Sequence, residues 1–124
     1  MSKIVLVEDE FIIAMVLEKQ LQKFGYDLAA KVTNGKDAID AVKTHQPDLI
    51  IMDIKIDGDM DGVDVMNEIR KFSDVPVIYM SGNSDSGTRE RASKTGPVDY
   101  MVKPIPIQEL NNSIKKGLAK NMAG

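Results

Sequence analysis

The sequence of 124 residues has no cysteine, no tryptophan and one histidine, His45. Without cysteine the chain can form neither a disulfide framework nor a thiolate metal site, which agrees with a reducing compartment. Basic residues are also in the minority: 16 lysines and arginines stand against 19 acidic residues, giving a net charge of -3. Because this charge provides no basic field for a phosphate backbone, we expect no nucleic-acid partner.

Long apolar runs are missing as well. The first run, residues 4–7, ends at Glu8-Asp9-Glu10 and is far too short for a signal peptide or a membrane span. We therefore expect a cytoplasmic protein without a membrane partner. The chain length, with 43% hydrophobic residues, suits one domain over residues 1–124. Its core is expected between about residues 3 and 118, and such a domain can bury a self-sufficient core.

The rest of the chain is arranged around residues 48–53, Asp-Leu-Ile-Ile-Met-Asp. Four unbroken apolar residues, preceded by Pro47 and Asp48 and followed by Asp53, predict a short strand buried on both faces. Such a strand lies in the middle of a sheet, and Asp53 stands where it surfaces. A charge at that point costs folding energy unless it is paired. We therefore interpret Asp53 as a residue kept for its chemistry.

Apolar periodicity and turn residues predict five strands that alternate with five helices. The strands are expected at 4–7, 28–32, 48–53, 75–80 and 98–102, and the helices at 11–24, from 35, from 61, at 84–95 and from 106. This alternation is typical of the α/β class and predicts a doubly wound parallel sheet with helices on both faces. In such a sheet the ligand site lies at the carboxyl ends of the strands.

Four of the predicted strands end in polar residues: Glu8-Asp9-Glu10, Asp53, Ser81-Gly82-Asn83 and Lys103. The carboxylates of Glu8, Asp9 and Asp53 would repel one another unless a cation lies among them. Oxygen ligands without histidine or cysteine favour a hard ion, Mg²⁺ or Mn²⁺. With Ser81 and Lys103 nearby, the crevice suits a tetrahedral dianion, and Asp53 is the candidate nucleophile for an acyl-phosphate.

At this point the sequence resembles the receiver domains of two-component response regulators, over almost its whole length. The motifs that carry the resemblance are Val-Glu-Asp-Glu at 7–10, Pro-Asp-Leu-Ile-Ile-Met-Asp at 47–53, Met-Asp-Gly at 60–62, Tyr-Met-Ser-Gly at 79–82 and Asp-Tyr-Met-Val-Lys-Pro at 99–104. Each motif is short, but their occurrence in this order is specific. The resemblance implies a flavodoxin-like (βα)5 fold with strand order 2-1-3-4-5.

The resemblance also implies a function. Asp53 would accept a phosphoryl group from a phosphohistidine of a sensor histidine kinase or a histidine phosphotransfer protein. Such a chain is not an enzyme with its own substrate; it catalyses only its own phosphorylation and dephosphorylation. No effector domain follows in this sequence, so we expect a stand-alone receiver that signals to a downstream protein by contact.

Roles for single residues follow from the same resemblance. Ser81 would follow the phosphoryl group, Tyr100 would be the switch aromatic, and Lys103 would bind phosphate. The metal ligands would be Glu8, Asp9, Asp53 and the backbone carbonyl of Lys55, and a cis peptide is implied before Pro104. The sequence departs from the family after Asp53, where Asp57-Gly58-Asp59 replaces the usual Met-Pro and Lys55 adds a cation.

Three other functions share part of this pattern. A phosphatase of the haloacid-dehalogenase type also uses a strand-end aspartate with Mg²⁺, but it needs a second aspartate as general acid where this chain has Lys55. A flavodoxin-like FMN site is disfavoured because Glu8-Asp9-Glu10 would repel the phosphate. Residues 57–68 match the EF-hand loop pattern, yet an apolar strand precedes them instead of a helix, so we interpret the match as coincidence.

The predicted helix at 84–95 has Ala92 as its only apolar residue. A helix that is polar on nearly all sides has little to hold it in place, and low local stability suits a mobile switch element. We therefore expect the signal to leave through this helix, the fifth strand and the face of the last helix that bears Asn111 and Lys115.

Overall fold

The computed structural model describes residues 2–82 and 85–123, with side chains as far as residue 119. Five parallel strands form one sheet in the order β2-β1-β3-β4-β5, which confirms the predicted fold class. The strands are β1 (Lys3–Val7), β2 (Asp27–Val32), β3 (Leu49–Asp53), β4 (Val77–Ser81) and β5 (Asp99–Val102). The helices are α1 (Phe11–Lys23), α2 (Gly35–His45), α3 (Gly62–Ile69), α4 (Ser86–Ser93) and α5 (Ile107–Ala123). In this part of the chain no helix is long and apolar enough to cross a membrane.

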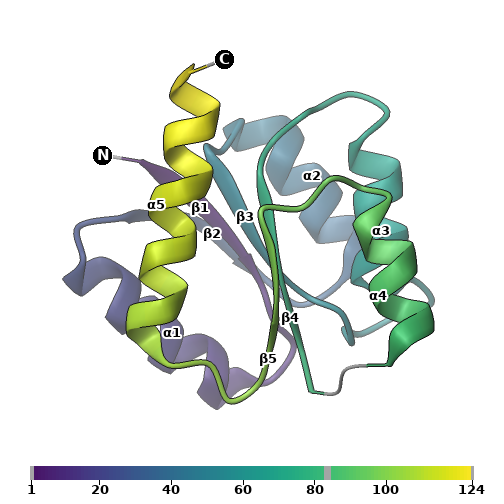
Figure 1. Cartoon of the computed structure of the whole chain (residues 1–124), viewed down its shortest axis with the longest axis horizontal. Helices are drawn as coiled ribbons and strands as arrows, with labels where there is room; N and C mark the ends of the chain where they lie inside the picture. The colour runs from purple at the N-terminus through teal and green to yellow at the C-terminus, as the bar shows by residue number, and fades with distance from the viewer. Residues whose placement is uncertain (1, 83–84, 124) are drawn as a thin grey trace.

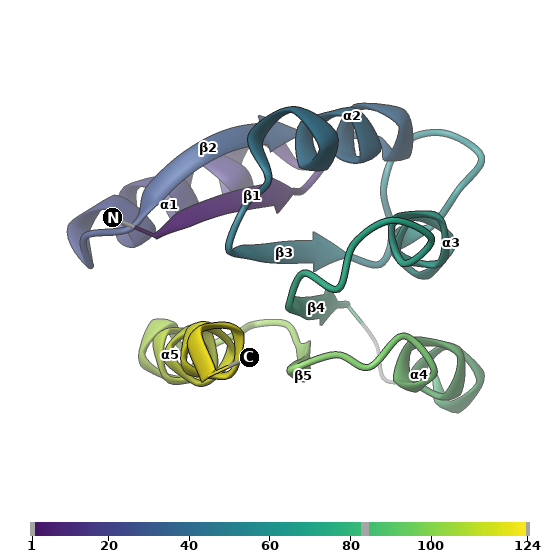
Figure 2. The ribbon, with the colours of Figure 1, turned by 90° about the horizontal axis from the view of Figure 1, so that it is seen from above.

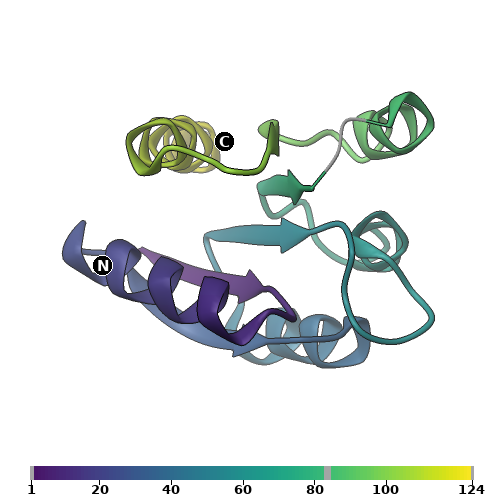
Figure 3. The ribbon, with the colours of Figure 1, turned by 90° about the horizontal axis from the view of Figure 1, so that it is seen from below.

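The sheet separates two layers of helices (Figure 1). Helices α1 and α5 cover one face, and α2, α3 and α4 cover the other, as the view from above also shows (Figure 2). This arrangement follows from right-handed crossovers on either side of the first strand. The carboxyl ends of the strands lie together at the lower edge in Figure 1, and Figure 3 looks at the molecule from that side.

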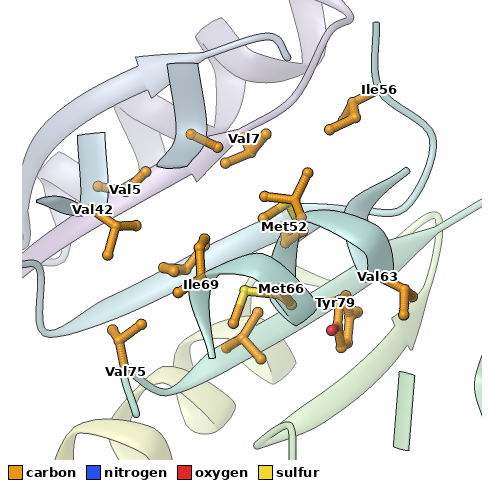
Figure 4. Close-up of a cluster of buried hydrophobic side chains, with 14 of the residues drawn as sticks. Val5, Val7, Val42, Met52, Ile56, Val63, Met66, Ile69, Val75 and Tyr79 are labelled. Carbon is orange, nitrogen blue, oxygen red and sulfur yellow. The ribbon is translucent and has the colours of Figure 1, made fainter. Parts of the chain in front are cut away.

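Side chains alternate along the central strands and so build two cores. Ile4 and Leu6 of β1 point to the α1/α5 layer, whereas Val5 and Val7 point to the α2/α3 layer, and the other central strands alternate in the same way. Figure 4 shows the second of these cores, in which Met66 and Ile69 of α3 pack on the sheet. Because β1, β3 and β4 are covered on both faces, their unbroken apolar runs satisfy the pattern of a parallel sheet.

The ends of the helices match the sequence signals in part. The Asn34 side chain accepts a hydrogen bond from the Asp37 N–H and caps α2, and Gly25 after α1 has a left-handed φ of 90°. Phe24 and Phe72 lie beyond the last turns of α1 and α3 and are exposed. The first residue of the predicted helix at 84–95 lies outside the described residues, and the helix itself starts at Ser86.

The connection from β3 to α3 carries two apolar residues that belong to the core. Ile54 and Ile56 alternate with exposed residues and are buried in the α2/α3 core. The backbone N–H of Asp57 donates to the Thr33 carbonyl at 3.2 Å, so the loop is joined to the start of α2. Asp57 thus connects the loop to the residues between β2 and α2, while Ile54 and Ile56 hold it against the core.

Candidate functional site

The register of the sheet brings Asp53 and Lys103 together at its carboxyl edge. Asp53 pairs with Met80 of β4, and the Lys103 N–H after β5 donates to the Ser81 carbonyl at 2.7 Å. The Lys103 ammonium then lies 2.8 Å from Oδ2 of Asp53 and 3.0 Å from Oε1 of Glu8. One cation thus bridges two carboxylates that come from different strand ends.

Both carboxylates are removed from solvent, with exposed fractions of 1% for Glu8 and 3% for Asp53. Burial, together with the hydrogen bond and the negative charge of Asp53, raises the pKa of Glu8 to about 7, although Lys103 acts to lower it. Burial would lower the pKa of Lys103, but its hydrogen bonds to Asp53 and Glu8 outweigh burial and raise it. Both pKa shifts agree with a site in which two buried carboxylates share one positive charge. As the pH falls to about 7, Glu8 takes up a proton, whereas Lys103 stays protonated.

This pKa makes the stability of the metal-free protein depend on pH. Folded Glu8 holds its proton up to about pH 7, whereas the unfolded group releases it near the ordinary value of 4.5. The folded state therefore binds more protons between these values, and the free energy of unfolding is expected to fall as the pH rises from about 4.5 to about 7, by at most roughly 3 kcal/mol. Urea unfolding at a series of pH values measures this, and Glu8→Gln should flatten the profile. An unchanged slope in Glu8→Gln would contradict the assignment.

The acidic side chains at the end of β1 could hold a cation. Oxygen atoms of Glu8, Asp9 and Glu10 come within 4.8 Å of one another, and in the described part of the chain this is the group with that geometry. Glu8 and Asp9, but not Glu10, were predicted as metal ligands from the sequence, although Glu10 stands in the same run of three acids. The donor set is all carboxylate, which fits a hard divalent ion. Asp53 adjoins the group through its contact with Glu8.

The other predicted site residues surround this centre in different ways. Ser81 is buried at the end of β4, next in the sheet to Asp53. Lys55 is exposed, and its backbone N–H lies 3.3 Å from Oδ1 of Asp53. The peptide bond between Lys103 and Pro104 is cis, as the resemblance implied.

Tyr100 on β5 is half-buried and turned towards the sheet. Its ring centre lies 6.0 Å from that of Tyr79, and the Arg89 guanidinium of α4 lies 4.7 Å from its ring centre on the outer side. The Tyr100 hydroxyl is buried without a hydrogen-bond partner among the described residues. This side chain therefore connects α4 with the sheet.

Two further results concern the loop that matches the EF-hand pattern. Asp61 is the N-cap of α3: its side chain accepts from the Asp64 N–H, and Asp64 accepts in return from the Asp61 N–H. The same two carboxylates bind Arg91 of α4. In the described part of the chain, Asp57, Asp59, Asp61 and Asp64 do not form a carboxylate cluster of the kind seen at Glu8, Asp9 and Glu10. Sequence reasoning missed Arg91, because an arginine on a polar helix gives no sign of its partner.

An edge of this kind on a 2-1-3-4-5 sheet is found in the receiver domains of two-component signalling. The family model named response regulator receiver domain matches residues 4–115. The chain therefore belongs to the response regulator receiver domain family, a family of signalling domains.

The chain is similar to several known proteins. It is 31% identical over 118 residues to the transcriptional regulatory protein PdtaR of Mycobacterium tuberculosis, which covers 95% of this chain and 57% of the relative. The chain thus spans a little over half the length of that relative. Among solved structures, the signal receiver domain of a modulated diguanylate cyclase from Desulfovibrio desulfuricans G20 is 28% identical, with a TM-score of 0.92, covering 99% of this chain and 98% of that one.

A second solved structure shows the fold alone. The CheY-like receiver domain protein of Methanospirillum hungatei JF-1 is 21% identical but has a TM-score of 0.92, with coverage of 99% of this chain and 98% of that chain. The fold is thus kept where most of the sequence differs.

Proposed function

We propose that Asp53 accepts a phosphoryl group from a phosphohistidine of a sensor histidine kinase or a histidine phosphotransfer protein. The observation that carries this proposal is the Lys103 ammonium, 2.8 Å from Oδ2 of a buried strand-end aspartate. In the transfer, a carboxylate oxygen of Asp53 attacks phosphorus, the P–N bond breaks, and its electron pair stays on the imidazole nitrogen. Lys103 then pairs with phosphoryl oxygens as well as with the carboxylate.

A divalent ion fits the same site. Glu8, Asp9 and Asp53 would hold Mg²⁺ or Mn²⁺ together with the backbone carbonyl of Lys55, and Glu10 lies close enough to contribute. When bound, such an ion neutralises charge on the phosphoryl oxygens. The hydroxyl of Ser81 stands on the neighbouring strand, from which it could donate to the same oxygens.

The donor is a protein that docks on α1. Phe11, Ile12 and Val16 at the start of α1 are large apolar side chains exposed to 72%, 70% and 46%, and such surfaces are typical of protein contacts. Ile12 and Val16 line a groove of about 490 Å³, together with Met80, Lys103, Pro104 and Ile105. Lys103 thus borders both the groove and Asp53. Because a phosphohistidine must approach Asp53 closely, its protein must cover the surface next to Lys103, and this surface is apolar.

Output to a downstream protein would use α4, β5 and the exposed side of α5. Helix α4 buries only Ala92, and β5 is the open edge of the sheet (Figure 2). The prediction that Asn111 lies on this face is wrong. Asn111 is 4% exposed and accepts a hydrogen bond from the Tyr26 hydroxyl at 2.6 Å, so it faces the interior. Lys115 is exposed and stays in the proposed surface.

Intact mass after incubation with acetyl phosphate and Mg²⁺ tests the acceptor. Wild type should gain one phosphoryl group, and Asp53→Asn should gain none. A phosphoryl adduct on Asp53→Asn would refute the role of Asp53, and rapid turnover of a generic phosphoester would favour the hydrolase.

A second arm separates donor docking from acceptor chemistry. Ile12→Ser with Val16→Ser should keep labelling by acetyl phosphate but lose at least tenfold in rate from a phosphorylated histidine kinase, because the apolar contact is removed. Gln22→Ser, an exposed change at the far end of α1, is the matched control. Equal rates from the kinase for wild type and the double variant would exclude this docking face.

A further inference from the structure

Helix α4 is held in place by charge instead of by an apolar face. It has eight residues, and Ala92 is the only one that is buried. By contrast, α3 has the same length and buries five of its residues. An isolated helix of this length is not stable in water, so α4 depends on its tertiary contacts.

The strongest polar contact of α4 is made by Arg91. Its Nη1 lies 2.9 Å from Oδ2 of Asp61, and its Nη2 lies 2.8 Å from Oδ1 of Asp64 and 3.3 Å from Oδ1 of Asp61. The planar guanidinium thus binds both carboxylates of the α3 capping box at once, a geometry that lysine cannot reproduce. Burial would raise the pKa of Asp61, but the hydrogen bonds from Arg91 and from the Asp64 backbone outweigh it and lower that pKa.

Asp61, a partner of Arg91, lies next to the backbone at Asp53 and Ile54. Asp61 directly precedes Gly62, whose N–H donates to the Ile54 carbonyl at 2.7 Å. A Cβ atom at Gly62 would overlap the carbonyl oxygen of Asp53, so the two backbones are in direct contact. A short chain of contacts therefore runs from the Asp53 backbone through the α3 N-terminus to Arg91 and α4.

We propose that Arg91 is the latch of α4: it ties this weakly packed helix to the α3 N-terminus beside Asp53 and sets how often the helix opens. The proposal concerns the unphosphorylated chain and stands apart from the phosphoacceptor role. Because the latch is a partly exposed ion-pair network, salt weakens it, whereas an apolar contact would be unaffected or strengthened. A helix held in this way can be released by a change in local charge, with Ala92 as the only α4 residue that leaves the α2/α3 core.

Hydrogen exchange of the whole protein, followed by mass spectrometry, tests the latch. Arg91→Gln should speed exchange of the α4 amides about three- to tenfold, the range expected for two partly exposed ion pairs, without change in β1 or β3. Asp61→Asn with Asp64→Asn removes the charges but keeps side-chain oxygens that can cap α3, and it should have the same effect. Lys94→Gln is the control, an exposed lysine of the same segment with no ion pair in the described part of the chain.

Two readouts separate a latch from a general loss of stability. The triple variant combines Arg91→Gln with Asp61→Asn and Asp64→Asn. Its α4 amides should exchange no faster than those of Arg91→Gln alone, because the arginine change and the aspartate changes remove the same interaction. Raising NaCl from about 0.05 M to 1 M should speed α4 exchange in wild type and leave Arg91→Gln unchanged. The proposal would be overturned if the α4 amides of Arg91→Gln exchanged at the wild-type rate, or if the effects added in the triple variant. Faster exchange throughout the sheet of Arg91→Gln would also overturn it.

Discussion

Lys103→Met is expected to lower the free energy of unfolding of the metal-free protein by about 3 to 5 kcal/mol at pH 8, the usual cost of removing one partner from a buried ion pair. The ammonium is the shared partner of Glu8 and Asp53, which are both buried. Without it two negative charges would face each other away from water. Methionine keeps much of the alkyl chain, so the loss reports the charge and not the packing.

The pH dependence identifies the cause. At pH 4.5 Glu8 is protonated, because its pKa is raised to about 7, and the destabilisation by Lys103→Met should shrink to less than half. Added Mg²⁺ should restore part of the stability at pH 8, since a cation that binds only the folded carboxylates stabilises the fold. Lys55→Met is the matched control at the same crevice, exposed and without an ion pair among the described residues, and should change stability by less than about 0.5 kcal/mol. Equal losses at both pH values would show that packing, and not charge, is responsible.

Gly62→Ala is the second change with a large expected effect, a loss of about 3 kcal/mol, the upper end of what overpacking a core costs. The added Cβ would overlap the carbonyl oxygen of Asp53 and lie 2.8 Å from Cγ of Met52. Neither atom can move freely, since Asp53 is held in the sheet and Met52 is fully buried. The α3 N-terminus must therefore shift away from the strand.

Urea unfolding measures this loss, and Gly82→Ala is the control. A Cβ atom at Gly82 would meet nothing within 4 Å, so this variant should unfold within about 0.5 kcal/mol of wild type. The shift of α3 should also disturb the Asp53 backbone, visible as amide shift changes at Asp53 and Ile54 in NMR spectra. A wild-type unfolding midpoint for Gly62→Ala would contradict the close approach.

Sequence patterns were sufficient for the fold and for the residues at the strand ends. The apolar run at 49–52 indicates a central strand because it is short and because a strand covered on both faces is apolar at consecutive positions, and Asp53 stands directly after it. Parallel strands bring their carboxyl ends to one edge, so Glu8, Ser81 and Lys103 could be placed near Asp53 without coordinates. Chain order and side-chain period carry this information locally.

Tertiary structure alone decided which of these groups touch. Nothing in the sequence shows that Lys103 bridges Glu8 and Asp53, that Asn111 turns inward to Tyr26, or that Arg91 reaches across to Asp61 and Asp64. Each of these contacts joins residues at least 27 positions apart. Their geometry depends on the packing of whole elements, and a long polar side chain can reach several partners from one position on its helix or strand. The sequence determined which chemistry lies at the edge of the sheet, and packing determined which charges pair there.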